Sequence, residues 1–328
     1  MKHLVANALT LLIVLCLCVA GAGYVGVKKF DAEGPLSEAK LIEIKGGATI
    51  NAAAEMLLAE GVIDSASVFR MGARYKGVHN QLKFGEYEIP AGSSMDDVLS
   101  IIISGKSLQY KITVAEGLTS WEVVELLKAS DLLSGEIAEI PAEGVLAPDT
   151  YFVAKGADRE GLLRRMRTAQ MEILKNAWDN RQPGLPISSP EEALILASII
   201  EKETGVGAER EMVAGVFVNR LVKRMRLQSD PTIIYGITLG QGPLGRSIRR
   251  SDISRATPYN TYVIDRLPPG PIANPGRETI VATLNPAETK ALFFVADGTG
   301  GHAFAETLRQ HEKNVAAWRK IERARKSQ

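Results

Sequence analysis

The stretch ALILASIIEKET, residues 193–204, decides the fold because it joins a long apolar run to an acidic end. Leu196, Ile200 and Glu203 follow the i, i+4, i+7 spacing that places side chains on one face of an α-helix. Surface helices carry carboxylates opposite such a stripe, whereas Glu203 lies on it. Apolar surroundings raise the pKa of a carboxyl, which suits a general acid near neutral pH. Alternatively, Glu203 marks a frayed helix end and points at water.

The bulk composition indicates a folded protein without the character of a nucleic-acid-binding protein. The chain has 328 residues, of which 45% are hydrophobic and 23% charged, and its formal net charge is +1. This length favours two folded domains, and the hydrophobic content is sufficient for real cores. A net charge near zero argues against nucleic acid as a partner.

No motif for a metal or a cofactor is present. Both cysteines, Cys16 and Cys18, lie in the N-terminal apolar run, so the rest of the chain has neither a disulfide framework nor a cysteine metal site. No Walker loop, dinucleotide-binding glycine motif or nucleophile elbow occurs. The four histidines lack metal-binding spacing; they are His3, His79, His302 and His311. His302, between glycines and an aromatic, is a candidate for lining a site, although such a histidine is more often structural.

The N-terminus predicts a membrane segment. Residues 4–27 contain no charge, and these about 24 residues exceed the roughly 20 that a helix needs to span a bilayer. The small residues of VAGAG permit cleavage as a signal peptide. The length and the following Lys28 and Lys29 favour an uncleaved anchor instead, over residues 1–28 with a short cytoplasmic start. These lysines complicate the orientation, because positive charge prefers the cytoplasm.

A repeated pattern follows a short Gly- and Pro-containing linker at residues 29–39. Three times between residues 40 and 130, a strand leads through a glycine turn and an N-cap residue into an amphipathic helix. The second and third copies have capping boxes, which pair Ser94 with Asp97 and Thr119 with Glu122. We therefore expect a small α+β module, or a pair of modules, over residues 40–130.

The region 131–325 has a different character. Three helical patterns come first, and the sequence after Met225 is rich in loops that contain Pro and Gly. Long loops in a compact domain often bind ligands, and glycine lets the backbone come close to them. The predicted fold class is thus α+β: an N-terminal transmembrane helix, a small α+β module, and a mainly helical domain with a loop-built groove.

Carboxylates are the best candidates for chemistry in this second region. Most glycosidases pair two carboxyls across the scissile bond, but one acid suffices when the substrate supplies its own nucleophile. Asp230 is either a second polar group in the same cleft or a turn residue before Pro231, and the turn is slightly favoured. The candidate acids are Asp149, Glu201, Glu203, Glu209 and Asp230.

The segment 259–262, Tyr-Asn-Thr-Tyr, combines aromatic faces with amide and hydroxyl groups. Sugar rings have apolar faces and polar edges, so this mixture suits a saccharide site. A tyrosine-containing turn packed for structure explains the segment equally well. Ser198 has no obvious histidine partner, so serine nucleophilic chemistry is unsupported.

Five ordered motifs together carry a family resemblance: ASIIEKET, VFVNRL, MRLQSDPTIIYG, YNTYVIDRLPPGPIANPG and LFFVADGTGGHAF. With APDTYF upstream, at residues 147–152, they closely resemble the endolytic murein transglycosylases, the YceG-like or MltG family. The resemblance extends over essentially the whole chain. It implies that residues 40–130 are a LysM-like module and that residues 131–325 are a YceG-like catalytic domain.

The resemblance also implies location, activity and site. The expected location is the bacterial inner membrane, single-pass, with the bulk of the chain periplasmic or outside the cell. The expected enzyme is a carbon–oxygen lyase without a cofactor. It cuts the MurNAc-β-1,4-GlcNAc bond inside nascent peptidoglycan strands, leaves 1,6-anhydro-MurNAc ends and terminates elongation. The implied catalytic residue is Glu203, and cell-wall synthases (penicillin-binding proteins) are expected partners. Our candidates for lining the groove are Asn219, Gln228, Asp230, Tyr259, Asn260 and Tyr262.

Two other interpretations stay open at this stage. The chain can be a non-catalytic glycan-binding scaffold of the cell-wall synthesis machinery, which binds strands and creates no new ends. It can also be a true hydrolase, a muramidase, which adds water and leaves reducing ends.

Overall fold

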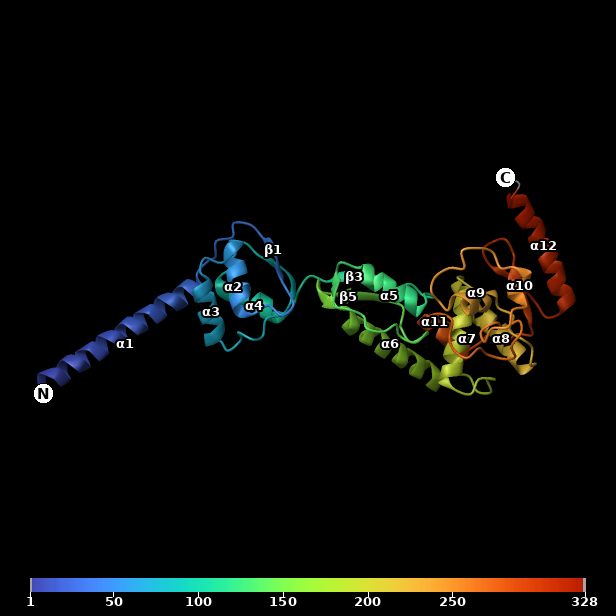
Figure 1. Ribbon diagram of the computed structural model, residues 1–328, viewed down its shortest axis with the longest axis horizontal. Coiled ribbons are helices and arrows are strands. Elements are labelled where there is room, and N and C mark those ends of the chain that lie inside the picture. The colour runs from blue at the N-terminus through green and yellow to red at the C-terminus, as the bar shows by residue number, and fades with distance from the viewer. Residues whose placement is uncertain (1, 327–328) are drawn as a thin grey trace. The chain divides into compact units, whose positions relative to one another are not determined.

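The computed structural model describes residues 2–326 and contains two compact units (Figure 1). Each unit is described by itself. Unit 1 comprises Met1–Lys111 together with Asp131–Ser134 and Phe152–Ala157, and unit 2 comprises Ile112–Ser130, Gly135–Tyr151 and Asp158–Gln328. The elements are mixed and mostly helical, so the α+β prediction is confirmed at this coarse level.

Unit 1 begins with the helix α1, Lys2–Asp31, which carries the predicted apolar segment. Its portion Leu9–Asp31 is long and apolar enough to cross a membrane. The helix continues past residue 28, the predicted end of the anchor, and the side chain of Phe30 is buried in the core of unit 1. The start of the predicted linker is therefore helical and packed.

The rest of that linker is bound to unit 1 rather than loose. The Gly34 N–H donates to the carbonyl of Gly92 (3.1 Å), and the Gly92 N–H donates to the carbonyl of Leu36 (2.8 Å). A Cβ added at Gly34 would collide with the carbonyl oxygen of Ser93, so only glycine permits this approach. The segment between α1 and the first strand thus packs as part of the unit.

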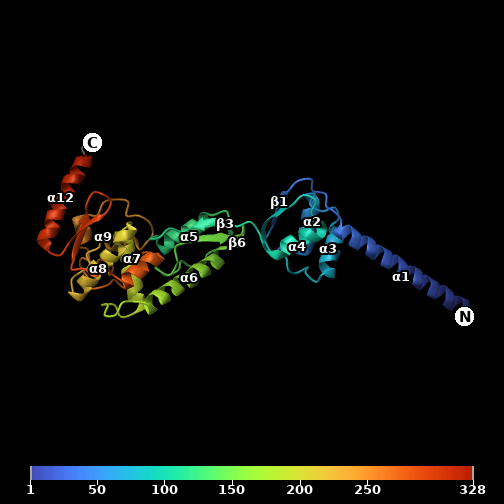
Figure 2. The same cartoon turned by 180° about the vertical axis from the view of Figure 1, so that it is seen from behind.

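A two-stranded sheet and three helices form the body of unit 1. Strand β1, Lys40–Ile44, pairs antiparallel with β2, Gly85–Ile89, and Lys40 lies opposite Ile89. The helices are α2, Ile50–Ala59, α3, Ala66–Tyr75, and α4, Met95–Ser104. Figure 2 shows these helices grouped beside β1 at the end of α1.

Local sequence explains where these helices begin. The hydroxyls of Thr49, Ser65 and Ser94 accept hydrogen bonds from the first backbone N–H groups of α2, α3 and α4, and Ser94 forms the predicted capping box with Asp97. Apolar side chains then meet in one core. Its largest fully buried members include Ile42, Leu57, Phe69, Tyr87 and Leu99.

The third copy of the repeat departs from the predicted grouping. Its strand β3, Tyr110–Thr113, pairs with β5, Thr150–Val153, and its helix α5, Ser120–Ala129, begins at the predicted Thr119 capping box. The short strands β4, Leu133–Ser134, and β6, Ala157–Asp158, form another pair. Because α5 belongs to unit 2, the two compact units do not divide at residue 130, where the sequence-based boundary lies.

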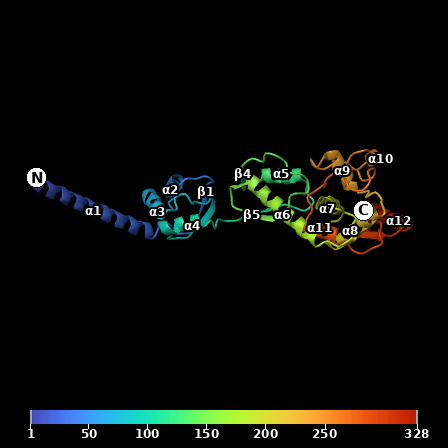
Figure 3. The same ribbon diagram turned by 90° about the horizontal axis from the view of Figure 1, so that it is seen from below.

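Unit 2 is built around α7, Pro190–Glu203, which contacts α6, α8, α9 and α11 (Figure 3). Residues 193–200 are all buried, so α7 is apolar around its whole circumference and not only along the predicted stripe. The surrounding helices are α6, Arg159–Asp179, α8, Arg210–Val222, α9, Asp230–Thr238, and α11, Arg277–Leu284.

The remaining elements of unit 2 are short or terminal. A 3-10 turn η1, Gly207–Glu209, precedes α8, and α10, Arg250–Ile253, lies in the long loop region after α9. The strands β7, Phe293–Ala296, and β8, His302–Ala305, form an antiparallel hairpin that α12, Leu308–Lys326, contacts.

Candidate active site

The last turn of α7 sends three consecutive polar side chains in three directions, because successive helical residues point about 100° apart. The Glu201 carboxylate accepts a hydrogen bond from the Gly276 N–H (2.9 Å). The Lys202 ammonium donates to the carbonyl of Gly117 (3.1 Å). Glu203 is left for the third direction, and its surroundings define the candidate site.

Glu203 keeps some exposed surface, yet its carboxyl is enclosed densely enough that burial raises its pKa. The neighbouring Ser229 hydroxyl opposes this rise, although the pair does not reach ordinary hydrogen-bond geometry. The charge of Asp230 raises the pKa further, while His302 and Arg220 lower it. The carboxyl is thus enclosed and surrounded by charges rather than free in water. The catalytic role of Glu203 stays a prediction.

The loop before α9 presents Ser229 to the site. Gln228 has a left-handed backbone (φ 51°), and its N–H donates to the carbonyl of Thr261 (3.2 Å). The Ser229 N–H donates to the Thr261 hydroxyl (2.9 Å). The Ser229 hydroxyl is buried and has no hydrogen-bond partner among the described residues. This hydroxyl lies near the Glu203 carboxyl, whose pKa it lowers.

Asp230 and Tyr262 form the other wall. Asp230 is the first residue of α9, and its carboxylate accepts a hydrogen bond from the Tyr262 hydroxyl (2.7 Å). Burial, followed by this hydrogen bond, raises the pKa of Tyr262. Tyr262 is half-buried and Asp230 is exposed, so the pair reaches from the enclosed carboxyl of Glu203 out to solvent.

Arg220 places a buried positive charge near the same carboxyl. From α8, its Nε donates to the carbonyl of Leu292 (2.7 Å) and its Nη1 to the carbonyl of Leu227 (2.6 Å). The guanidinium lies over the ring of Phe293, 5.4 Å from its centroid. Burial lowers the pKa of Arg220, and the nearby Tyr262 and Glu203 favour its charged form. The two hydrogen bonds fix this charge in place.

His302, at the start of β8, is held by Glu209. The Glu209 carboxylate accepts the backbone N–H of His302 (2.9 Å) and contacts its ring Nδ1 (2.7 Å). A Cβ at Gly301 would lie 2.6 Å from the same carboxylate, so a side chain there would displace the end of Glu209. Glu209, one of the candidate acids, therefore orients a histidine near Glu203.

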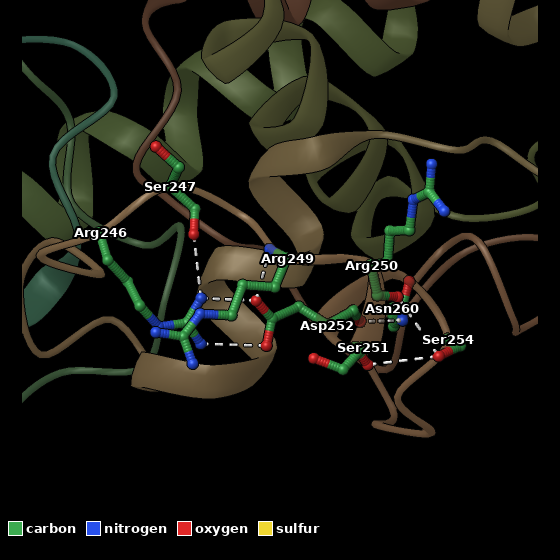
Figure 4. Close-up of polar contacts among 8 residues, drawn as sticks. All are labelled: Arg246, Ser247, Arg249, Arg250, Ser251, Asp252, Ser254 and Asn260. Atoms are coloured by element: carbon green, nitrogen blue, oxygen red, sulfur yellow. Dashed lines mark hydrogen bonds and ion pairs between the residues drawn. The ribbon is translucent and has the colours of Figure 1, made fainter.

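Asn260 was predicted to line the groove, but its side chain is buried and hydrogen-bonds to the backbone of its own loop region (Figure 4). Its amide Nδ2 donates to the carbonyls of Asp252, Ile253 and Arg255 (3.2, 3.0 and 2.7 Å), and its Oδ1 accepts the Tyr262 N–H (3.0 Å). These bonds use its polar atoms. Asn260 thereby ties the loop around α10 to the segment that carries Tyr262.

The same loop contains a bidentate ion pair, which Figure 4 shows beside Asn260. The guanidinium of Arg246 donates to both carboxylate oxygens of Asp252 (2.6 and 3.0 Å), and the Arg249 N–H donates to one of them (2.8 Å). These contacts lower the pKa of Asp252 to about 2. The loop is rigidly organised although it has little regular structure.

The other predicted lining residues lie apart from Glu203 or serve other contacts. The Asn219 amide donates to the carbonyls of Thr289 (2.7 Å) and Ala291 (3.1 Å), which braces the loop before β7. Tyr259 is half-buried and packs on Tyr235, with ring centroids 4.7 Å apart. The Gln228 side chain is exposed. Substrate contacts by these side chains stay predictions.

A pocket of about 350 Å³ lies along α9. Lys202, which precedes Glu203 in the chain, and Pro231, which follows Asp230, line it. Other lining residues are Ile234, Tyr235, Gly240 and Leu244. Glu203 and Asp230 themselves are not among its lining residues.

Glu143 holds residues around this pocket in place, and sequence analysis did not predict it as a site residue. Its carboxylate accepts the Ser120 N–H (2.6 Å), the Asn274 amide (3.3 Å) and the Tyr235 hydroxyl (3.2 Å). Burial raises the pKa of Glu143 despite these bonds. Nothing in its local sequence, PAEGVL, distinguishes it from a surface glutamate. Ser229 and Arg220 were not predicted as site residues either, although both lie inside the motifs that carry the family resemblance.

Among the described residues, no group of three or more His, Cys, Asp or Glu side chains is placed to hold a metal ion. The polar groups around Glu203 instead suit a neutral polar ligand. They offer an enclosed acid, a buried cation, a free hydroxyl and an aromatic hydroxyl.

Comparison with known proteins places this arrangement in a class. The chain belongs to the YceG-like family, whose model matches residues 42–317. This range includes most of unit 1 and nearly all of unit 2, so the family covers both the fold and the candidate site.

Relatives of the chain carry a consistent name. A protein of Bacillus subtilis, named endolytic murein transglycosylase, is 30% identical over 83% of this chain and 82% of its own length. A protein of the same name from Streptococcus pneumoniae is 27% identical over 96% of this chain and 65% of its own length. A crystal structure of a YceG-like protein from Listeria monocytogenes has a TM-score of 0.51 and 30% identity, and the match covers 84% and 99% of the two chains.

Proposed function

We propose that this chain is an endolytic murein transglycosylase that cuts the MurNAc-β-1,4-GlcNAc bond inside nascent peptidoglycan strands. The observation that carries the proposal is the Glu203 carboxyl, which lies at the end of a buried helix and has a pKa raised by burial. The names of the relatives support the reaction class. Cutting nascent strands would terminate their elongation.

A single carboxyl accounts for both half-steps of the reaction. Protonated Glu203 donates to the glycosidic oxygen, the bond between that oxygen and C1 breaks, and the GlcNAc hydroxyl leaves. The N-acetyl group of the MurNAc stabilises the developing oxocarbenium. The Glu203 carboxylate then accepts the proton of the C6 hydroxyl, and O6 bonds to C1. No water is consumed, and the product ends in 1,6-anhydro-MurNAc.

The neighbours of Glu203 fit the two charge states that this sequence requires. Burial favours the protonated acid before the first step. After it has donated its proton, the fixed charge of Arg220 and the hydroxyl of Ser229 stabilise the carboxylate. Asp230 and Tyr262, which are hydrogen-bonded to each other, would hold sugar hydroxyls in this proposal. We accordingly assign Asp230 to the groove, the alternative that the sequence slightly disfavoured.

The location and the role of unit 1 are part of the same proposal. Helix α1 is long and apolar enough to act as a membrane anchor or a signal sequence, and we assign it as a single-pass anchor of the bacterial inner membrane. The bulk of the chain then lies in the periplasm or outside the cell, where the glycan strands are. The LysM-like module is proposed for residues 40–130, of which unit 1 contains the first two strand–helix copies, and penicillin-binding synthases are the proposed partners.

One digest tests the activity against both alternatives. Purified sacculi are incubated with the full-length chain in detergent, and the released muropeptides are identified by mass spectrometry. We expect new anhydro ends, whose mass lacks the water of a hydrolysed end. Reducing ends would instead establish a muramidase. Binding to the sacculi without any new ends would establish a glycan-binding scaffold.

A further inference from the structure

A groove of about 570 Å³ lies within unit 1 and is lined by residues of α1 and α3. Figure 1 shows α3 at the end of α1. The catalytic proposal does not use it. Its walls are mostly apolar or small, with a polar rim at one edge. Its lining residues include Val27, Phe30, Met71, Tyr75, Lys76 and Asp96.

The length of α1 determines the level of this groove in a bilayer. Residues 4–27 carry no charge, and at about 1.5 Å per residue they span about 36 Å, against about 30 Å for the hydrocarbon core. The core therefore ends about one turn before Val27. The groove, whose α1 wall runs from Gly23 to Asp31, begins at that boundary and reaches the headgroup layer.

The depth of the groove relative to the bilayer is fixed, because the end of α1 is packed into unit 1. Phe30 is buried in the core, and a Cβ at Gly72 would collide with its ring. Lys76 lies over the same ring, 5.7 Å from its centroid, and Lys29 pairs with Asp64 at 3.4 Å. Helix α3 is thereby fixed beside the last turns of α1.

Two side chains of α3 that line the groove, Met71 and Tyr75, are unusually exposed for residues with large apolar surfaces. Tyr75 is 89% exposed and Met71 59% exposed, and Tyr24 on α1 is 66% exposed. Tyrosines are typical of the membrane–water interface, where the ring is in apolar surroundings and the hydroxyl is wet. The polar rim of the groove, where Lys76 pairs with Asp96, suits the headgroup layer.

We propose that a phospholipid acyl chain of the extracytoplasmic leaflet occupies the groove between α1 and α3. Met71 and Tyr75 are then immersed in the interface, and unit 1 is bound to the membrane surface in one orientation. This inference rests on the proposed membrane location and goes beyond it, because anchoring by α1 alone does not require a lipid to occupy the groove.

The test uses the full-length chain with Cys16 and Cys18 replaced by serine and one new cysteine for a spin label. The label is placed at Met71 or Tyr75, and a matched control carries it at Leu58, a 40% exposed apolar residue of α2 outside the groove. The proteins are reconstituted in phosphatidylethanolamine–phosphatidylglycerol vesicles. Relaxation by oxygen, which concentrates in lipid, is compared with relaxation by a water-soluble nickel chelate.

We expect oxygen to dominate at positions 71 and 75 and the chelate to dominate at position 58. Chelate dominance at all three positions, in chains that float with the vesicles, would overturn the groove proposal alone. Dipolar broadening between labels at position 75 would show that a second copy of the chain occupies the groove, which would also overturn it. A chain that does not float would refute the membrane location. The sacculus digest, run on the same samples, reports the proposed activity separately.

Discussion

Replacing Glu203 by glutamine should abolish glycan cleavage while leaving the fold intact. Gln has nearly the same volume, so the packing at the end of α7 is retained, but the side chain can neither donate nor accept the transferred proton. A general acid or base contributes roughly 10²–10⁴-fold. Because Glu203 serves both half-steps, we expect a loss at the upper end of this range, about 5 kcal/mol of transition-state stabilisation.

The raised pKa of Glu203 adds a pH signature to this prediction. The wild-type rate should fall as the pH rises through the pKa of the folded state, because the acid form is consumed. The folded-state pKa lies above the unfolded value of about 4.3, so stability is greatest below that value and is lost as the pH rises through the folded-state pKa. Glu203→Gln removes this loss, so the variant should gain stability relative to the wild type toward neutral pH.

The assay counts anhydro ends released from sacculi per unit time, and thermal unfolding is followed from pH 4 to pH 8. Glu191→Gln, an exposed site in the first turn of the same helix, is the matched control and should keep wild-type activity. Anhydro ends released by Glu203→Gln within tenfold of the wild-type rate would refute the assignment. A variant that loses activity through unfolding would be recognised by its melting curve.

Three further outcomes are expected. Glu143→Ala leaves the Ser120 N–H and the Tyr235 hydroxyl without their acceptor, so the free energy of unfolding should fall by roughly 2–4 kcal/mol in a denaturant titration, and an unchanged midpoint would contradict the bracing role. Arg220→Met removes a charge that lowers the pKa of Glu203, so the fall in rate should shift to higher pH; an unshifted profile in a folded variant would contradict this. The wild-type chain should stay in the membrane fraction at full length, whereas a mature N-terminus near residue 22 would show cleavage as a signal peptide.

Local patterns predicted much of the fold because they act through neighbouring residues. The apolar run gave α1, the alternation and capping boxes gave the strand–helix pairs, and the run 193–200 gave the central helix. The grouping of the third repeat was not predictable in this way. Its helix α5 has the same local grammar as α2 and α4, and only long-range contacts, such as the Thr119 hydroxyl with the carbonyl of Gly240 (2.7 Å), assign it to unit 2.

The sequence predicted the site residue that its own helical pattern distinguishes. It did not predict the roles of residues that depend on partners far away in the chain. Glu203 continues the spacing of Leu196 and Ile200 beyond the buried run 193–200, and that pattern is visible in the sequence. Asn260 and Tyr259 looked equally suitable for sugar binding, but the partners of Asn260 are backbone carbonyls at positions 252–255. Ser229 lacks a partner only because its loop is folded against Thr261, which no local pattern reveals.

The way in which α7 ends has a consequence for how this chain can change over time. Insertion of one residue after Ile200 would turn the last three side chains by about 100° and detach Glu201 from Gly276 and Lys202 from Gly117 as it displaced Glu203. Single replacements at these positions leave the other contacts in place. A change of length in this segment therefore disrupts three side-chain positions at once, whereas a replacement of Glu203 changes the acid and keeps the two contacts beside it.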